Sequence, residues 1–221
     1  MMKKILMMCG LGAALIYTGT VILGGMIRPE YSHLKEAISE LVADGAPNRL
    51  LLSSLFLVYN ALVSLFGLGL FLKALSHPRG RVLGIAGSLV LMLLVGISGV
   101  LMELAFPQDP GGLPTTFAGT MHIVMAGVAS LGTMAAVLLL GLWFRNFPEL
   151  KKHAVYSLVS VAVIFVSGGF TAAAMANQFT YFGILERVTI GTFIVWLFVM
   201  GYKLGQLQGT ASSPLQPEFS K

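Results

Sequence analysis

Charged side chains are scarce in this chain of 221 residues, where lysine, arginine, aspartate and glutamate together make up 10%. Soluble globular domains carry about 25%. Hydrophobic residues make up 56%, and the mean hydropathy is +0.85. This composition excludes the soluble globular class and is typical of a polytopic membrane protein. The formal net charge of +5 does not indicate a nucleic-acid partner, because the basic residues are scattered through short loops beside apolar segments.

Cysteine and catalytic motifs are also nearly absent. Cys9 is the only cysteine, so no internal disulfide forms and the cysteine count does not indicate a redox compartment. The chain contains no G-x-S-x-G elbow, no P-loop and no dinucleotide-binding fingerprint. Hydrolase, ATPase and Rossmann-type functions therefore have no motif support. The sequence assigns neither a cofactor nor an enzymatic activity.

Six long apolar runs lie between short polar loops. A helix rises 1.5 Å per residue, so about 20 residues cross a hydrocarbon layer about 30 Å thick. Each run must be helical, because lipid offers no partners for unpaired backbone groups. The sequence therefore predicts one all-α membrane domain, residues 1–204, with six transmembrane helices at approximately 5–27, 50–75, 82–106, 116–144, 154–176 and 181–204.

Lysine and arginine are distributed unequally between the two sides of the predicted bundle. Ten of the 14 fall on the side that holds both termini, and four fall on the other side. The richer side is expected to be cytoplasmic. We therefore expect a multi-pass protein of the plasma (inner) membrane with both termini in the cytoplasm. Residues 205–221, rich in Gly, Ser, Gln and Pro, are expected to form a disordered cytoplasmic tail.

A polar stretch, residues 29–49, separates the first two apolar runs and reads PEYSHLKEAISELVADGAPNR. On a helical wheel its apolar side chains share one side and its polar side chains the other, namely His33, Glu36, Glu40 and Asp44. Pro29 suits a first-turn position, and Gly45 suits a helix end. The pattern predicts an amphipathic helix over residues 29–44 that lies on the outer membrane surface.

Ionisable side chains gather at the outer ends of the predicted spans. Glu103, Glu186 and Arg187 lie within or at the ends of apolar runs, where an unpaired charge is expensive. We expect Glu103 to pair with Arg187, and His122 with Glu186, beneath the amphipathic helix as a lid. The candidate binding residues of this outer polar cluster are His33, Ser39, Glu40, Asn48, Glu103, Asp109, His122, Glu186 and Arg187.

The spacing of candidate metal ligands does not match a known motif. His33, Glu36 and Glu40 would share one face of the predicted amphipathic helix, and His122 is a further candidate ligand. The run lacks the paired histidines of an H-E-x-x-H zinc site. A surface helix carries such residues by default, so no metal is assigned.

Four interpretations of the outer polar cluster are consistent with the sequence. The first is an outward-facing pocket that binds or transports a lipid headgroup or small polar molecule, which is the leading hypothesis for a ligand-related function. The second is an intramembrane enzyme, in which carboxylates and His33 or His122 hold a divalent metal or act as acid and base on a lipid-like substrate. The third is a purely structural ionic network without a ligand. The fourth is a haem site formed by His33 and His122.

Several short motifs occur in order along the chain. They are PEYSHLKEAISEL and GAPN before the second span, FPQD after the third, His122 early in the fourth, and Glu186–Arg187 in the sixth. With these motifs the chain resembles the bacterial and archaeal membrane proteins catalogued as domain of unknown function 998, over about residues 5–204. The resemblance implies six spans and supplies no reaction. By position it singles out Ser39, Glu40, Asn48, Pro107, Asp109, His122, Glu186 and Arg187.

Overall fold

The computed structural model describes residues 2–210 of the chain, and in this part it contains helices and no strand. The α-helices are α1 (Met2–Ile27), α2 (Arg49–Leu75), α3 (Arg81–Val90), α4 (Ser98–Leu104), α5 (Phe117–Phe144), α6 (Lys151–Ala176) and α7 (Phe182–Thr210). A π-helical segment, Leu91–Ile97, joins α3 and α4 into one continuous span. Two short 3-10 helices lie at Ile38–Val42 and Pro148–Leu150.

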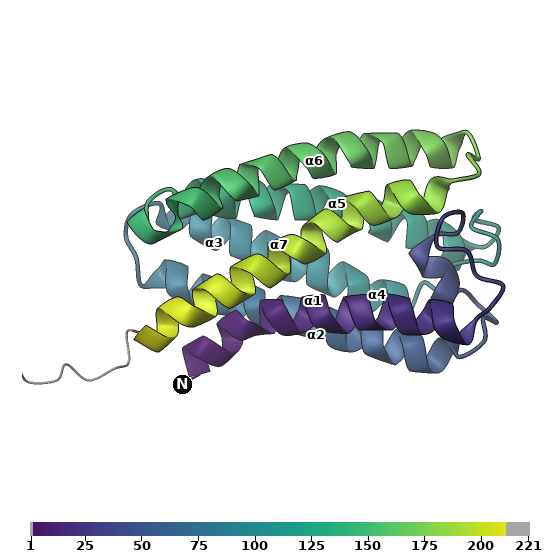
Figure 1. Ribbon diagram of the computed structural model, residues 1–221, viewed down its shortest axis with the longest axis horizontal. Helices are drawn as coiled ribbons and strands as arrows, with labels where there is room; N and C mark the ends of the chain where they lie inside the picture. The colour runs from purple at the N-terminus through teal and green to yellow at the C-terminus, as the bar shows by residue number, and fades with distance from the viewer. Residues whose placement is uncertain (1, 211–221) are drawn as a thin grey trace, which may run out of the picture.

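Six spans within the described residues are long and apolar enough to cross a membrane, so the predicted all-α, six-span architecture is confirmed. They are Met2–Ile27, Arg49–Leu75, Arg81–Leu104, Phe117–Phe144, Pro148–Ala176 and Phe182–Gln208. The beginning of α1 and the end of α7 lie at the same end of the bundle (Figure 1). The opposite end carries the connections 28–48, 105–116 and 177–181, and we call it the loop end.

The spans form a closed ring in chain order. Each packs on the next, from α1 and α2 through the span made of α3 and α4 to α5, α6 and α7, and α7 packs against α1. Large side chains occupy the interior of the ring. Phe66 of α2 and Trp196 of α7 are fully buried and meet edge to face, with ring centroids 6.3 Å apart. This contact across the ring fixes the distance between α2 and α7.

The contact between α1 and α7 depends on small residues. A Cβ atom at Gly201 of α7 would lie only 2.8 Å from the carbonyl carbon of Gly10 in α1, so the two backbones touch directly. Further along α7, Gly205 lies against Met8 of α1. This packing continues α7 into the first residues of the expected tail, since the helix ends at Thr210. The rest of that tail, 211–221, lies outside the described residues.

The predicted amphipathic helix over residues 29–44 is wrong. Residues 28–48, which we call the cap segment, form turns around a short 3-10 helix, Ile38–Val42, and fold over the loop end. Most large apolar side chains of the cap segment pack on α1 and α2 rather than in lipid, and Leu34 is exposed. The buried apolar residues are Tyr31, Ile38, Leu41, Val42 and Ala43.

The side chains of α7 explain why the cap segment is not an α-helix. Arg187 donates a hydrogen bond to the backbone carbonyl of Glu36, and Glu186 accepts one from the backbone N–H of Ile38. In an α-helix the Ile38 N–H would donate to the Leu34 carbonyl, and the Glu36 carbonyl would accept from the Glu40 N–H. Charged side chains from a distant helix therefore outcompete the local pattern on which the helical wheel depends.

Candidate functional site

Two adjacent residues of α7 hold the cap segment at the loop end. The Glu186 carboxylate lies 2.7 Å from the backbone nitrogen of Ile38, and the Arg187 guanidinium lies 2.9 Å from the carbonyl oxygen of Glu36. Arg187 also donates to the carbonyl of Gly183 in its own helix, at 2.9 Å. Neighbouring helical side chains point about 100° apart. The two residues therefore reach different backbone groups of the same segment.

Tyr31 is the central side chain in the contact between the cap segment and α7. The guanidinium carbons of Arg28 and Arg187 lie 5.9 and 5.6 Å from its ring centroid. Its hydroxyl accepts a hydrogen bond from Arg187 and donates one to the carbonyl of Ala37, at 2.8 Å. Burial raises the pKa of Tyr31 to about 12. The phenol therefore keeps its proton, and with it the bond to Ala37, at neutral pH.

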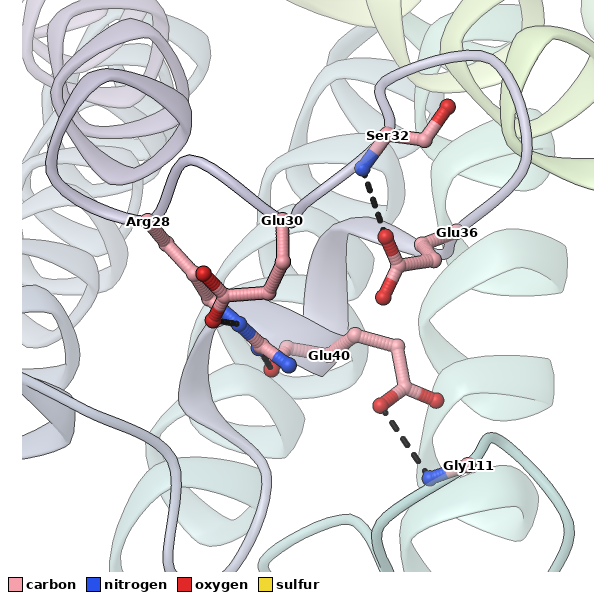
Figure 2. A network of polar contacts seen from close by, with 6 residues as sticks. All are labelled: Arg28, Glu30, Ser32, Glu36, Glu40 and Gly111. Carbon is pink, nitrogen blue, oxygen red and sulfur yellow. Dashed lines mark hydrogen bonds and ion pairs between the residues drawn. The ribbon is translucent and has the colours of Figure 1, made fainter.

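The three candidate metal ligands of the cap segment have separate partners. His33 Nδ1 lies 3.3 Å from the Arg187 guanidinium, and burial together with that positive charge lowers the pKa of His33. Glu36 accepts a hydrogen bond from the backbone N–H of Ser32, at 2.5 Å. Figure 2 shows that Glu40 instead points toward the loop between α4 and α5. Within the described chain, no group of three or more His, Cys, Asp or Glu side chains could hold a metal ion.

Glu40 and Ser39 join the cap segment to the loop between α4 and α5. The buried Glu40 carboxylate accepts a hydrogen bond from the Gly111 backbone N–H at 3.3 Å (Figure 2). It accepts a second from the Gln108 side-chain amide, also at 3.3 Å. Ser39 donates to the side-chain oxygen of Gln108 at 2.5 Å. Burial raises the pKa of Glu40, and its two hydrogen bonds oppose that rise. Both candidate residues are thus engaged in fastening two loops together.

Asp109 closes the loop that leads into α5. Its carboxylate accepts hydrogen bonds from the backbone N–H groups of Thr115 and Thr116, at 2.6 and 2.7 Å, and from both threonine hydroxyls. Thr116 is the N-cap of α5 and accepts from the backbone N–H of Gly119 at 3.0 Å. The hydrogen bonds lower the pKa of Asp109 to about 2. Asp109 therefore stabilises the start of α5 through its charged form.

We expect Asp109→Ala to lower the melting temperature at neutral pH, because the first turn of α5 loses these hydrogen bonds. The folded-state pKa is depressed, so the stabilisation is present above the ordinary aspartate pKa of about 3.9 and is lost as pH falls toward 2. Thermal unfolding in detergent should show that the difference between wild type and variant shrinks between about pH 4 and pH 2. A constant difference would contradict this role. Asp44→Asn, which removes an exposed carboxylate, is the matched control.

The expected pairs Glu103–Arg187 and His122–Glu186 are wrong. The buried His122 instead places its Nδ1 2.8 Å from the carbonyl oxygen of Phe106, while Glu186 and Arg187 bind the cap segment. The helix order is the physical reason. In the ring, α4 packs between α2 and α5, whereas α7 packs between α1 and α6. The order of the helices in the bundle cannot be derived from a single sequence, so the sequence does not reveal which spans are neighbours.

Glu103 of α4 faces α2 across a small cavity. Arg49 and Ser53, four residues apart on one face of α2, lie beside the Glu103 carboxyl group. The Oε2 atom of Glu103 and the Oγ atom of Ser53 are buried, and neither makes a hydrogen bond within 3.5 Å in residues 2–210, although the Ser53 hydroxyl is near enough to the Glu103 carboxyl group to interact with it. The cavity, which we call the Arg49–Glu103 cavity, has a volume of about 300 Å³. It is lined by Arg49, Leu50, Ser53, Ser54, Leu57, Glu103 and Leu104.

The sequence singled out Glu103 but missed the other polar residues of this cavity. Arg49, Ser53 and Leu57 follow one another at intervals of four, a spacing that places them on one face of a helix. This spacing is the signal in the sequence that points to Arg49 and Ser53 as neighbours. Asn48 is exposed and precedes α2 with a left-handed backbone, φ 58°. It directs the chain into the helix that carries Arg49.

Comparisons with known proteins identify a family. No match was found among curated proteins or among solved structures. The family model described as "protein of unknown function (DUF998)" matches residues 11–203, from the first span to the last. The match covers well over half of the chain and agrees with the six-span architecture. The chain is therefore an integral membrane protein that belongs to the DUF998 family.

Proposed function

We propose that the protein binds a lipid headgroup, or a polar molecule of similar size, in the Arg49–Glu103 cavity. The observation that carries this proposal is the buried Oε2 atom of Glu103 at the cavity wall, which lacks a hydrogen-bond partner in the described chain. Leaving a buried acceptor unsatisfied costs about 1–3 kcal/mol, and more if the group is charged. Buried polar atoms in native proteins almost always have a hydrogen-bond partner, either a protein group, water or a ligand. A ligand in the cavity supplies the missing donor.

The lining of the cavity suits an amphiphile. Arg49 and Glu103 contribute opposite charges, two serines contribute hydroxyl groups, and three leucines contribute apolar surface. Ligand pockets combine apolar walls with a few placed polar groups in this way. A volume of about 300 Å³ is at the small end of the range for ligand pockets. It can hold a headgroup while the acyl chains stay in the bilayer.

The rim of the cavity supports lateral access from the membrane. Leu50 and Leu104 are 84% and 68% exposed, and both lie at the loop end of spans that cross the membrane. Exposed leucines at the ends of membrane-spanning helices contact lipid. The excess of lysine and arginine on the other side supports placing the loop end outside the plasma membrane. We therefore propose that the cavity takes its ligand from the outer leaflet.

The remaining polar residues support a structural role for the cap segment. Glu40, Asp109, Glu186 and Arg187 all make hydrogen bonds with protein groups that order the loops or hold them to α7. We propose that this network fixes the loop end, and that the ligand site lies beside it. The ionic network expected as an alternative is thus assigned to the cap segment, and binding is assigned to the Arg49–Glu103 cavity.

Filling the cavity tests the proposed function. We expect Ser53→Phe to reduce the phospholipid that stays bound after exhaustive detergent exchange by roughly tenfold, which corresponds to about 1.4 kcal/mol of binding free energy. The readout is bound phospholipid per protein chain, measured by mass spectrometry. Val58→Phe is the matched control, because Val58 lies on the same helix, is 46% exposed and is not part of the cavity. Equal lipid retention by the two variants would contradict the proposal.

A further inference from the structure

We infer that the occupant of the Arg49–Glu103 cavity is the headgroup of a membrane phospholipid that carries a primary ammonium next to its phosphate, as in an ethanolamine phospholipid. This inference rests on the proposed function and names its ligand class. It follows from three features of the cavity: the unpaired carboxylate oxygen, the arginine on the facing helix, and the residue types that line the walls.

The Glu103 carboxylate calls for an N–H donor with positive charge. Its buried Oε2 atom makes no hydrogen bond within 3.5 Å among the described residues, and the nearby Ser53 hydroxyl is a neutral donor. A charge-assisted hydrogen bond is the strongest way to satisfy the carboxylate. A primary ammonium brings three N–H groups and neutralises the carboxylate. A quaternary ammonium brings none, and proteins hold it instead with cages of aromatic rings. The part of the lining that the structure describes contains no aromatic residue.

Arg49 is placed to hold the phosphate of the same headgroup. Its guanidinium uses one nitrogen for Asp44, at 2.7 Å, which leaves other N–H donors for a second anion. Arginine matches phosphate oxygens with two parallel hydrogen bonds. Arg49 also begins α2, a helix of 27 residues whose amino end favours negative charge. The cavity thus presents a cationic side and an anionic side to one small zwitterion.

The remaining lining distinguishes a lipid from a free small molecule. The buried Ser53 hydroxyl lies beside the Glu103 carboxyl group and can bond to the phosphate or ammonium group between the two charges. The exposed side chains of Leu50 and Leu104 provide apolar contact where acyl chains would leave the cavity. A soluble phosphoethanolamine would leave these contacts unmade. The apolar rim therefore favours the lipid as the source of the headgroup.

Other abundant headgroups fit the cavity less well for stated reasons. A glycerol headgroup has a phosphate for Arg49 but no cation for Glu103. A choline headgroup has a cation without N–H donors. A serine headgroup has the ammonium but adds a carboxylate close to Glu103, and like charges at this distance repel. The predicted order of retention therefore places ethanolamine first.

The experiment measures headgroup selection by the full chain. Purified protein in detergent is mixed with equal amounts of ethanolamine, choline, glycerol and serine phospholipids that share the same acyl chains, and native mass spectrometry identifies the lipid that stays bound. We expect ethanolamine lipid to be retained roughly tenfold over choline lipid, the effect of one charge-assisted hydrogen bond. Glu103→Gln should abolish this preference. Glu30→Gln, which removes an exposed carboxylate away from the cavity, should leave it unchanged.

The outcomes separate this inference from the proposed function. If the wild type retains all four phospholipids equally and Ser53→Phe still releases them, the cavity binds lipid and the ammonium inference is overturned. If no phospholipid is retained, both are overturned. Soluble O-phosphoethanolamine is tested in parallel, and binding as tight as that of the lipid would overturn the lipid as source. The wild-type ranking decides the inference even if Glu103→Gln does not fold.

Discussion

Arg187→Ala is expected to lower the free energy of unfolding by about 3 kcal/mol, because it removes one charge from a partly buried network and leaves its partners unpaired. Arg187 donates to the carbonyl of Glu36 and to the hydroxyl of Tyr31, and its positive charge faces the neighbouring Glu186. Loss of these contacts weakens the attachment of the cap segment to α7. Other anchors of the cap segment remain, among them the bonds of Glu186 and Glu40 and the backbone bond from Ile184 of α7 to the Leu34 carbonyl.

Two measurements check the Arg187 prediction. Equilibrium unfolding in mixed detergent micelles gives the free energy, and limited trypsin digestion after the exposed Lys35 reports release of the cap segment. Arg79→Ala removes an exposed arginine at the other end of the bundle and is expected to change stability by less than about 0.5 kcal/mol. If Arg187→Ala matched this control in both assays, Arg187 would not hold the cap segment.

Gly201→Ala is expected to destabilise the bundle by about 2 kcal/mol, an unusual cost for one methyl group. A Cβ atom at Gly201 would lie 2.8 Å from the carbonyl carbon and 3.0 Å from the Cα of Gly10, so α1 and α7 must move apart. These two helices close the ring of spans, and the cap segment follows directly from α1. Separation of α1 and α7 therefore also disturbs the loop end.

The same substitution elsewhere on α7 controls for helix propensity. Around Gly191, no atom of the described chain lies within 4 Å of an added Cβ. Alanine is favoured over glycine within a helix by roughly 0.5–1 kcal/mol, so Gly191→Ala should be neutral or stabilising. Unfolding of both variants under one detergent condition gives the comparison. Similar stability of the two would show that α1 and α7 do not cross in backbone contact.

Hydropathy predicts the six spans because lipid leaves an apolar run little choice but a helix. The ends of the third span show the precision of this method, since 82–106 was predicted and Arg81–Leu104 is found. The cap segment shows its limit. Its polar and apolar residues have helical spacing, but Glu186 and Arg187, more than 140 positions away, bind its backbone. A contact between distant segments cannot be derived from local periodicity.

The candidate site was predicted in part. Glu103 was singled out because an ionisable group in a span is expensive, and it lies at the cavity. Its neighbours were not predicted, since that required knowing that α4 packs on α2. Asp109 was singled out by family position, but its carboxylate binds the loop before α5. A charged residue at a position that matches a family motif can either bind a ligand or order a loop, and the sequence does not distinguish the two roles.

The most direct test of the binding site is a structure of the full chain determined in bilayer nanodiscs made from ethanolamine and glycerol phospholipids. We predict a headgroup in the Arg49–Glu103 cavity, with its nitrogen within hydrogen-bond distance of Glu103 Oε2 and its phosphate within hydrogen-bond distance of Arg49. A cavity that holds only water, or one closed by direct pairing of Arg49 with Glu103, would contradict the proposed function.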